Sequence, residues 1–134
     1  MRNLLILYLL LNLSSLKAQN TSVYGWQEHL SYRNAKCLAE VNENIYCSTK
    51  NGLFYYNKND YTLGRLNKIT GLSDVGIASI AYDKINNIII IVYSNTNIDL
   101  IKNDEIINLP DIKDKIVVGE KRINNISIEN GLAY

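Results

Sequence analysis

The stretch AKCLAEVNENIYCSTKNGLFYYN, residues 35–57, decides the fold. Its first seven residues alternate between apolar and polar side chains and end at an Asn-Glu-Asn turn at 42–44. A second run, IYCST, leads through Lys-Asn-Gly at 50–52 into the aromatic run LFYY at 53–56. Alternation with a period of two indicates β-strands, and Asn and Gly favour the turns between them. The stretch therefore predicts an antiparallel meander, which continues through a turn at 58–60 into a fourth strand at 61–66.

The same series returns about 43 to 46 residues further along the chain. The second copy predicts strands at 75–82, 88–94, 98–101 and 105–109, and a third copy opens with a strand at 123–128, turns at 129–131 and continues through 132–134. Four short antiparallel strands at this period are the signature of a β-propeller blade. We predict an all-β fold with two such blades and the start of a third. Because propeller rings use roughly four to eight blades, this is an incomplete ring, and we expect it to be either a truncated product or the first part of a longer one.

The N-terminus has the pattern of an export signal. A positive start at Arg2 precedes the apolar run LLILYLLLNL at 4–13, which is too short to span a bilayer as a helix, and a cleavage region follows with the cut expected after Ala18. We predict a signal peptide at 1–18 and a partial propeller domain at 19–134, with a retained N-terminal anchor as the alternative. Near the start of the mature chain, Trp26 and Leu30 are expected to anchor the polypeptide to the ring.

Charge and composition exclude one class of partner. Lys and Arg number 14 and Asp and Glu 13, and removal of Arg2 and Lys17 with the signal leaves 12 against 13. This balance lacks the strong positive charge of a nucleic-acid-binding domain, so no nucleic-acid partner is predicted.

The two cysteines, Cys37 and Cys47, would meet an oxidising compartment after export. A three-residue turn at 42–44 would place Cys37 opposite Thr49 and Cys47 opposite Ala39, which makes the two thiols diagonal neighbours. A disulfide and two buried free thiols both remain open, and the free thiols are favoured.

Residues for bond chemistry are few. The one histidine, His29, lies too close to Glu28 and Ser31 in sequence for the three to be a triad, and no nucleophile motif surrounds them. Two cysteines and one histidine do not make a zinc set. The seven glycines are dispersed at turns and form no phosphate loop. We predict a non-enzymatic protein with no catalytic, cofactor or metal residues; its ligand-binding residues are unknown.

Two groups of charged residues remain as candidates. The aspartate pairs Asp99 with Asp104 and Asp111 with Asp114 lack the alternating ligands of a calcium loop, so we interpret them as solvated loop charges. A basic cluster flanks the start of the third copy and could meet an anionic ligand. Acidic residues are interleaved with it, which favours a mixed, solvated loop. The cluster consists of Lys113, Lys115, Lys121 and Arg122.

Several segments resemble known propeller repeats. YCSTKNGLFYYN at 46–57 and GLSD at 71–74 followed by IASIAYD at 77–83 are similar to the repeats of bacterial regulator-type propellers. WQEHLSY at 26–32, NIDL at 97–100 and GEKRIN at 119–124 resemble, in order and spacing, the N-terminal propellers of the PorZ family, type IX secretion proteins of Bacteroidetes. The resemblance covers residues 26–134.

This resemblance implies a role without bond chemistry. PorZ-like proteins are exported, reach the outer surface of the outer membrane and belong to an attachment complex with a sortase, to which they are thought to deliver anionic lipopolysaccharide. The expected function is therefore a surface binding and assembly module, and the expected partners are the sortase and anionic lipopolysaccharide. The main alternative is the periplasmic ligand-sensing propeller of a hybrid two-component receptor. A propeller enzyme and an unrelated extracellular interaction protein are less favoured classes.

Overall fold

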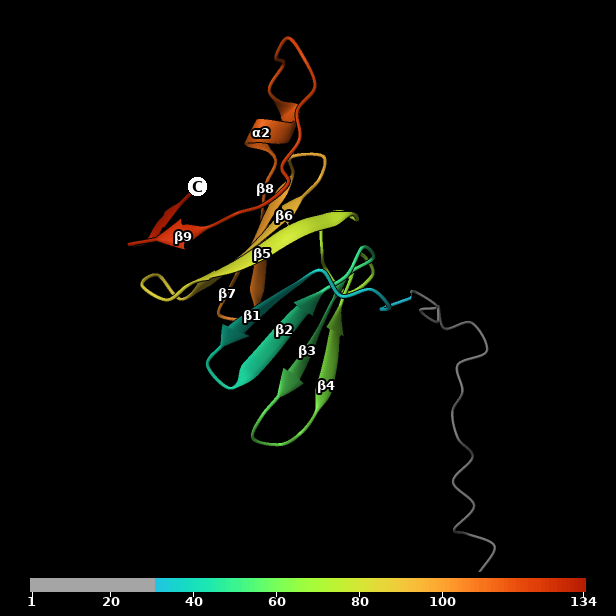
Figure 1. Cartoon of the computed structure of the whole chain (residues 1–134), viewed down its shortest axis with the longest axis vertical. Coiled ribbons are helices and arrows are strands. Elements are labelled where there is room, and N and C mark those ends of the chain that lie inside the picture. Colours follow the sequence, from blue (N-terminus) through green and yellow to red (C-terminus); the bar gives the residue numbers. More distant parts are fainter. Residues whose placement is uncertain (1–30) are drawn as a thin grey trace, which may run out of the picture.

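Two four-stranded antiparallel sheets form the body of the molecule (Figure 1). The computed structural model describes residues 31–134. We name the first sheet blade one and the second sheet blade two; in each, the strands follow one another in chain order. The strands of blade one are β1 (Cys37–Val41), β2 (Asn44–Ser48), β3 (Leu53–Asn57) and β4 (Leu63–Leu66), and those of blade two are β5 (Ile77–Asp83), β6 (Ile88–Tyr93), β7 (Ile98–Lys102) and β8 (Glu105–Leu109). The predicted all-β fold and both four-strand copies are confirmed.

Asparagine recurs where the chain reverses direction. Asn42, Asn87 and Asn130 have φ values of 53°, 55° and 51°, and each lies in the first hairpin turn of its copy. Asn tolerates this left-handed conformation better than most residues do, because its short polar side chain can bond to the local backbone. The abundance of Asn in the sequence is thus partly explained by repeated turns of one kind.

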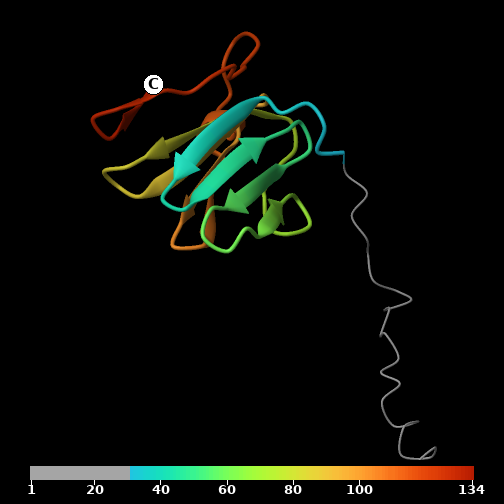
Figure 2. The ribbon, with the colours of Figure 1, turned by 60° about the horizontal axis from the view of Figure 1, so that its bottom comes forward.

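The two blades pack face to face as two layers (Figure 2). The core between them is aliphatic with two tyrosines, and Leu53, Ile77, Ile91 and Tyr93 are completely buried in it. Because β6 reads IIIIVY, it offers apolar side chains to both of its faces. Ile89 and Ile91 point to blade one, while Ile90 and Val92 point to the other side of the sheet. β6 therefore contributes apolar side chains both to the core between the blades and to the side of blade two that faces the third repeat.

The register of the first hairpin corrects the prediction for the cysteines. Val41 pairs with Asn44, so the turn has two residues rather than three, and Cys37 lies opposite Ser48 while Cys47 lies opposite Leu38. A shift of one residue moves a side chain to the other face of a sheet. Cys37 therefore faces blade two and Cys47 faces away from it. Both are free thiols, and burial raises the pKa of the Cys47 thiol.

The third repeat is shorter than predicted. Only β9 (Ile128–Glu129) and β10 (Leu132–Ala133) form ladder pairs, and the bonds between Ser127 and Tyr134 extend the hairpin by one step. The register pairs 128 with 133, so residues 123–126 would pair with positions beyond 134. The predicted strand at 123–128 is therefore realised only at its end.

A short helix, α2 (Asp111–Asp114), lies between blade two and the third repeat, where the sequence predicted only a loop. Within residues 31–134, no helix is both long enough and apolar enough to cross a membrane.

Candidate functional site at the blade junction and the adjoining groove

A buried carboxylate lies where the chain passes from blade one to blade two. Asp99 on β7 is fully buried and accepts three hydrogen bonds: from the Tyr93 hydroxyl at 2.6 Å, from the Ser73 backbone N–H at 2.8 Å and from Asn108 Nδ2 at 2.8 Å. A buried charge is tolerated when several donors satisfy it. Ser73 belongs to the segment between the blades, so Asp99 fastens that segment to blade two. The interpretation of Asp99 as a solvated loop charge was wrong.

The Tyr93 hydroxyl is held as a donor. Burial, followed by the hydrogen bond to Asp99 and its negative charge, raises the pKa of Tyr93 far above the usual range. Because deprotonation would place a second negative charge beside Asp99, the phenol stays neutral. The hydroxyl group therefore acts as a hydrogen-bond donor to Asp99 within the junction.

A second carboxylate, Asp74, extends the junction toward the surface. Its oxygens accept bonds from Asn95 Nδ2 at 2.6 Å and from Lys113 Nζ at 2.8 Å, and the Val75 N–H donates to it at 2.9 Å. Burial alone would raise the pKa of Asp74, but the bonds from Lys113, Asn95 and Val75 together outweigh burial, so the pKa lies far below its ordinary value. Asp74 is thus charged and links the segment between the blades to Asn95 of blade two and to Lys113 in the last turn of α2.

Two of the four cations in the basic cluster are bound to other groups of the same chain. Lys113 forms the ion pair with Asp74, and Lys121 Nζ donates to the carbonyl oxygens of Ile112, Lys113 and Lys115 at 2.9, 2.5 and 2.6 Å. Lys121 therefore satisfies carbonyl groups in and just after α2, where a cation is favourable. The loop is exposed, as predicted for a mixed, solvated loop. Two of its four cations, however, stabilise its conformation through an ion pair and hydrogen bonds.

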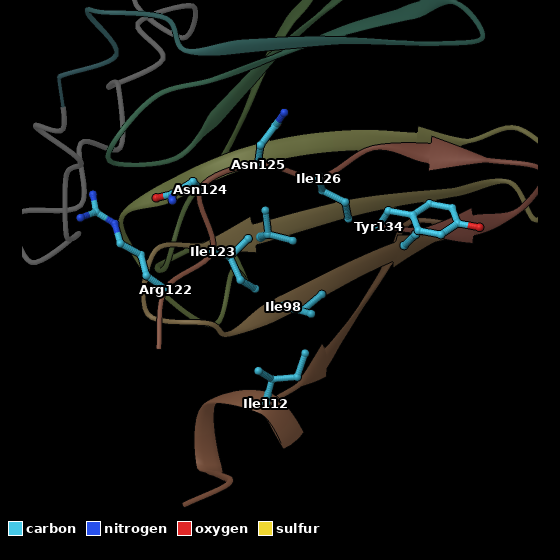
Figure 3. Close-up of a pocket in the computed structure, with 10 residues that line it drawn as sticks. Ile98, Ile112, Arg122, Ile123, Asn124, Asn125, Ile126 and Tyr134 are labelled. Carbon is cyan, nitrogen blue, oxygen red and sulfur yellow. The ribbon is translucent and has the colours of Figure 1, made fainter. Parts of the chain in front are cut away.

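An open groove of about 540 Å³ lies on the side of blade two that faces away from blade one (Figure 3). Its walls are mainly aliphatic, with Ile98 from β7, Ile112 from α2, and Ile123 and Ile126 from the third repeat. Arg122 and Tyr134 lie toward opposite ends of it. Such a surface can hold an apolar chain or a further strand.

The remaining candidate residues do not come together. Asp104, Asp111 and Asp114 are exposed, and no cluster of three potential metal-binding side chains exists within residues 31–134. Ser31 is exposed, while His29 and Glu28 lie outside the described residues, as does the proposed signal peptide at 1–18. The junction residues Tyr93 and Asn108 were missed; the signal that could have found them is a charged residue, Asp99, inside an otherwise apolar strand.

The repeat, the blade packing and the bonded junction define the chain as part of a β-propeller. The family of PorZ N-terminal β-propeller domains of type IX secretion matches residues 45–134, and the chain belongs to this family. Among solved structures, PorZ of Porphyromonas gingivalis, described as an essential bacterial surface component of the type IX secretion system, is similar, with 26% identity and a TM-score of 0.68. The match covers 75% of this chain and 14% of the PorZ chain. No curated protein matches.

Proposed function

We propose that the chain contributes a non-enzymatic propeller module to a surface component of type IX secretion. The observation that carries this proposal is the family match over residues 45–134, supported by a structural similarity to PorZ that covers 75% of the chain. Since the chain spans only 14% of that structure, the proposal concerns the part that these blades play in a larger assembly.

The finer role is assembly and delivery at the cell surface. In it, the protein is exported by its signal peptide, joins the attachment complex that contains the sortase, and presents anionic lipopolysaccharide to that enzyme. The blades would supply the scaffold, in which the buried Asp99 holds the segment between the blades to blade two and Asp74 holds the same segment to α2. The open groove and the exposed loop after α2 are the surfaces available to partners.

Deletion of the gene in its source bacterium tests the proposal. We expect type IX cargo to remain unprocessed and cell-associated, and complementation with the intact gene to restore its release. Normal cargo processing together with loss of a response to an external ligand would contradict the proposal and favour the sensor alternative.

Lipopolysaccharide delivery has its own test. The purified protein is passed over immobilised lipopolysaccharide with and without its anionic polysaccharide, at low and at high salt. We expect retention only on the anionic form, weakened by salt because exposed charges are screened. Equal retention on both forms would contradict an anionic ligand and leave the secretion role to be judged by the deletion.

A further inference from the structure

A cleft of about 210 Å³ opens between blade one and blade two, at the end of the blades where their hairpin turns lie (Figure 1). We call it the inter-blade cleft. Both of its walls belong to complete four-stranded blades, with β1 and β2 on one side and β5, β6 and β7 on the other. A further blade of a ring packs against the outer faces of these two and not between them. Closure of the ring therefore leaves the inter-blade cleft in place.

The floor of the inter-blade cleft is apolar. Val41 and Tyr46 from blade one and Ile89 and Ile101 from blade two belong to the core between the blades, and none of the four is more than 8% exposed. A ligand that enters the cleft therefore meets packed apolar atoms at its base.

The rim consists of short polar side chains carried by turns. Asn42, Asn87, Asn103 and Asp104 have φ values of 53°, 55°, 51° and 63°. Hairpin turns require this positive φ, so the turns fix the positions of the three amides and the carboxylate before a ligand arrives. The Tyr82 hydroxyl donates to Asn87 Oδ1 at 2.7 Å, which orients that amide with its Nδ2 as a donor.

One acceptor at the inter-blade cleft lacks a donor. Asn44 Oδ1 is shielded from solvent and receives no hydrogen bond from any group in residues 31–134. An enclosed acceptor without a partner is unfavourable. Asn44 begins β2 and lines the cleft, so rotation of its amide would bring this oxygen to a hydroxyl group of a ligand.

Charge and volume define the class of ligand. Among the described residues, Asp104 is the one charged side chain that lines the inter-blade cleft, so an anionic group is repelled there. Amides donate and accept hydrogen bonds at the same time, as neighbouring hydroxyl groups do. The volume lies below the range of about 300 to 1,000 Å³ that is usual for drug-sized ligands, which suits a single ring.

We propose that the inter-blade cleft binds one uncharged sugar ring of a glycan. Its hydroxyl groups bond to Asn44, Asn103 and Asp104, and its carbon atoms lie against the apolar floor. This inference does not depend on the secretion role. It also differs from the anionic ligand considered there, because this site has a carboxylate and no cation.

Saturation-transfer NMR on the intact gene product tests the proposal. The probes are three uncharged glycosides at millimolar concentration: methyl glucoside, methyl mannoside and methyl N-acetylglucosaminide. We expect at least one of them to receive saturation from the protein. If none of the three gives a signal, the proposal is wrong.

A pair of variants locates the binding. Asn44→Ala removes the amide that lacks a donor, and we expect it to weaken the signal of the uncharged probe several-fold. Asp104→Asn removes the repelling charge while keeping a residue that tolerates positive φ, so the signal of methyl glucuronide, an anionic probe, should rise several-fold. The matched control Asp111→Asn neutralises an exposed carboxylate on α2 and should change neither signal.

Far-UV circular dichroism and the thermal transition verify that the variants fold. Asp104 is exposed, so Asp104→Asn remains informative even if Asn44→Ala destabilises the blades. An uncharged-probe signal that Asn44→Ala leaves unchanged would overturn the proposal. So would a glucuronide signal that Asp104→Asn leaves unchanged.

A cationic side chain of a protein partner is the competing occupant, because an ammonium group could also donate to Asn44 and Asp104. Its probe is Nα-acetyl-lysine methylamide. We expect this probe to give no signal that Asn44→Ala removes. The opposite result, with a lysine signal lost in Asn44→Ala and no signal from the three glycosides, would overturn the proposal and assign the inter-blade cleft to a protein.

Discussion

Blades one and two have the same antiparallel order of four strands but differ in the contacts that hold each blade to the segment before it. Thr49 and Tyr93 occupy equivalent positions, since the N–H of each donates across the following turn, to Gly52 and to Asn97. Two residues after these acceptors come Phe54 in blade one and Asp99 in blade two. Phe54 is half-buried against the Tyr32 ring, whereas Asp99 is fully buried and accepts three hydrogen bonds.

The difference shows that the repeat determines the direction of this side chain but not its residue type. The four-strand meander sets where this side chain points, namely toward whatever precedes the blade. In blade one the preceding element is the aromatic segment at Tyr32, so an apolar ring fits there. In blade two it is the backbone at Ser73, whose N–H needs an acceptor, so a carboxylate fits.

The largest expected effect comes from breaking the polar fastening. Asp99→Ala leaves the Tyr93 hydroxyl, the Ser73 N–H and Asn108 without their buried acceptor, and we expect a loss of about 3 kcal/mol or more in unfolding free energy. Phe54→Ala removes a half-buried ring and should cost about 1 to 2 kcal/mol. Urea unfolding of both variants measures the difference. Equal losses would contradict the distinction between the two blades.

Much of the fold was predictable because the strand pattern repeats. The prediction was wrong where a single residue changes the length of a turn and so the register of a hairpin. At 42–44 the sequence offers three turn-forming residues, but Asn42 alone adopts a positive φ and Asn44 joins β2, which reversed the predicted relation of the cysteines. Turn length depends on backbone geometry that composition does not determine, and each shift of one residue exchanges the two faces.

The site was less predictable than the fold. Asp99 lies in a strand that the sequence identified, yet charge alone argued for solvent exposure, since an aspartate is rarely buried without partners. Its partners Ser73, Tyr93 and Asn108 come from three different segments, and only the folded chain brings them together. Likewise, the role of Lys121 depends on carbonyl groups that converge only once α2 has formed.

The next effect concerns the turn between the second and third strands of each blade, which is one residue longer in blade two. Gly52 and Asn97 are equivalent, but a Cβ at Gly52 would lie 2.5 Å from the backbone oxygen of Leu66. Backbone cannot move aside cheaply, so Gly52→Ala should cost about 2 kcal/mol. Asn97→Ala, which loses an amide acceptor for Asn108, should cost about 1 kcal/mol. Thermal unfolding ranks the pair. If Gly52→Ala is the milder change, the close approach has no energetic consequence.

A pH series isolates the outer part of the junction. The pKa of Asp74 is lower in the folded state than in the unfolded state. Its contribution to the free energy of unfolding is therefore fully present above the unfolded pKa near 4 and is lost as the pH falls through the folded pKa. Asp74→Asn should lose about 1 kcal/mol at neutral pH, and the difference from the unaltered protein should shrink in acid. Urea unfolding from about pH 7 to pH 3 measures it. A gap that is constant or widens in acid would contradict the assignment.

The smallest effect is expected from the ion pair at the other end of blade one. Lys58 and Glu40 are 2.7 Å apart but expose 36% and 69% of their side chains, whereas Asp74 in the corresponding pair with Lys113 exposes 12%. Water and salt screen an exposed pair, so Lys58→Ala should leave the melting temperature unchanged within error. Lys113→Ala should lower it measurably, because it leaves the enclosed Asp74 carboxylate without its cation. The reverse order in differential scanning calorimetry would mean that enclosure does not decide the strength of these pairs.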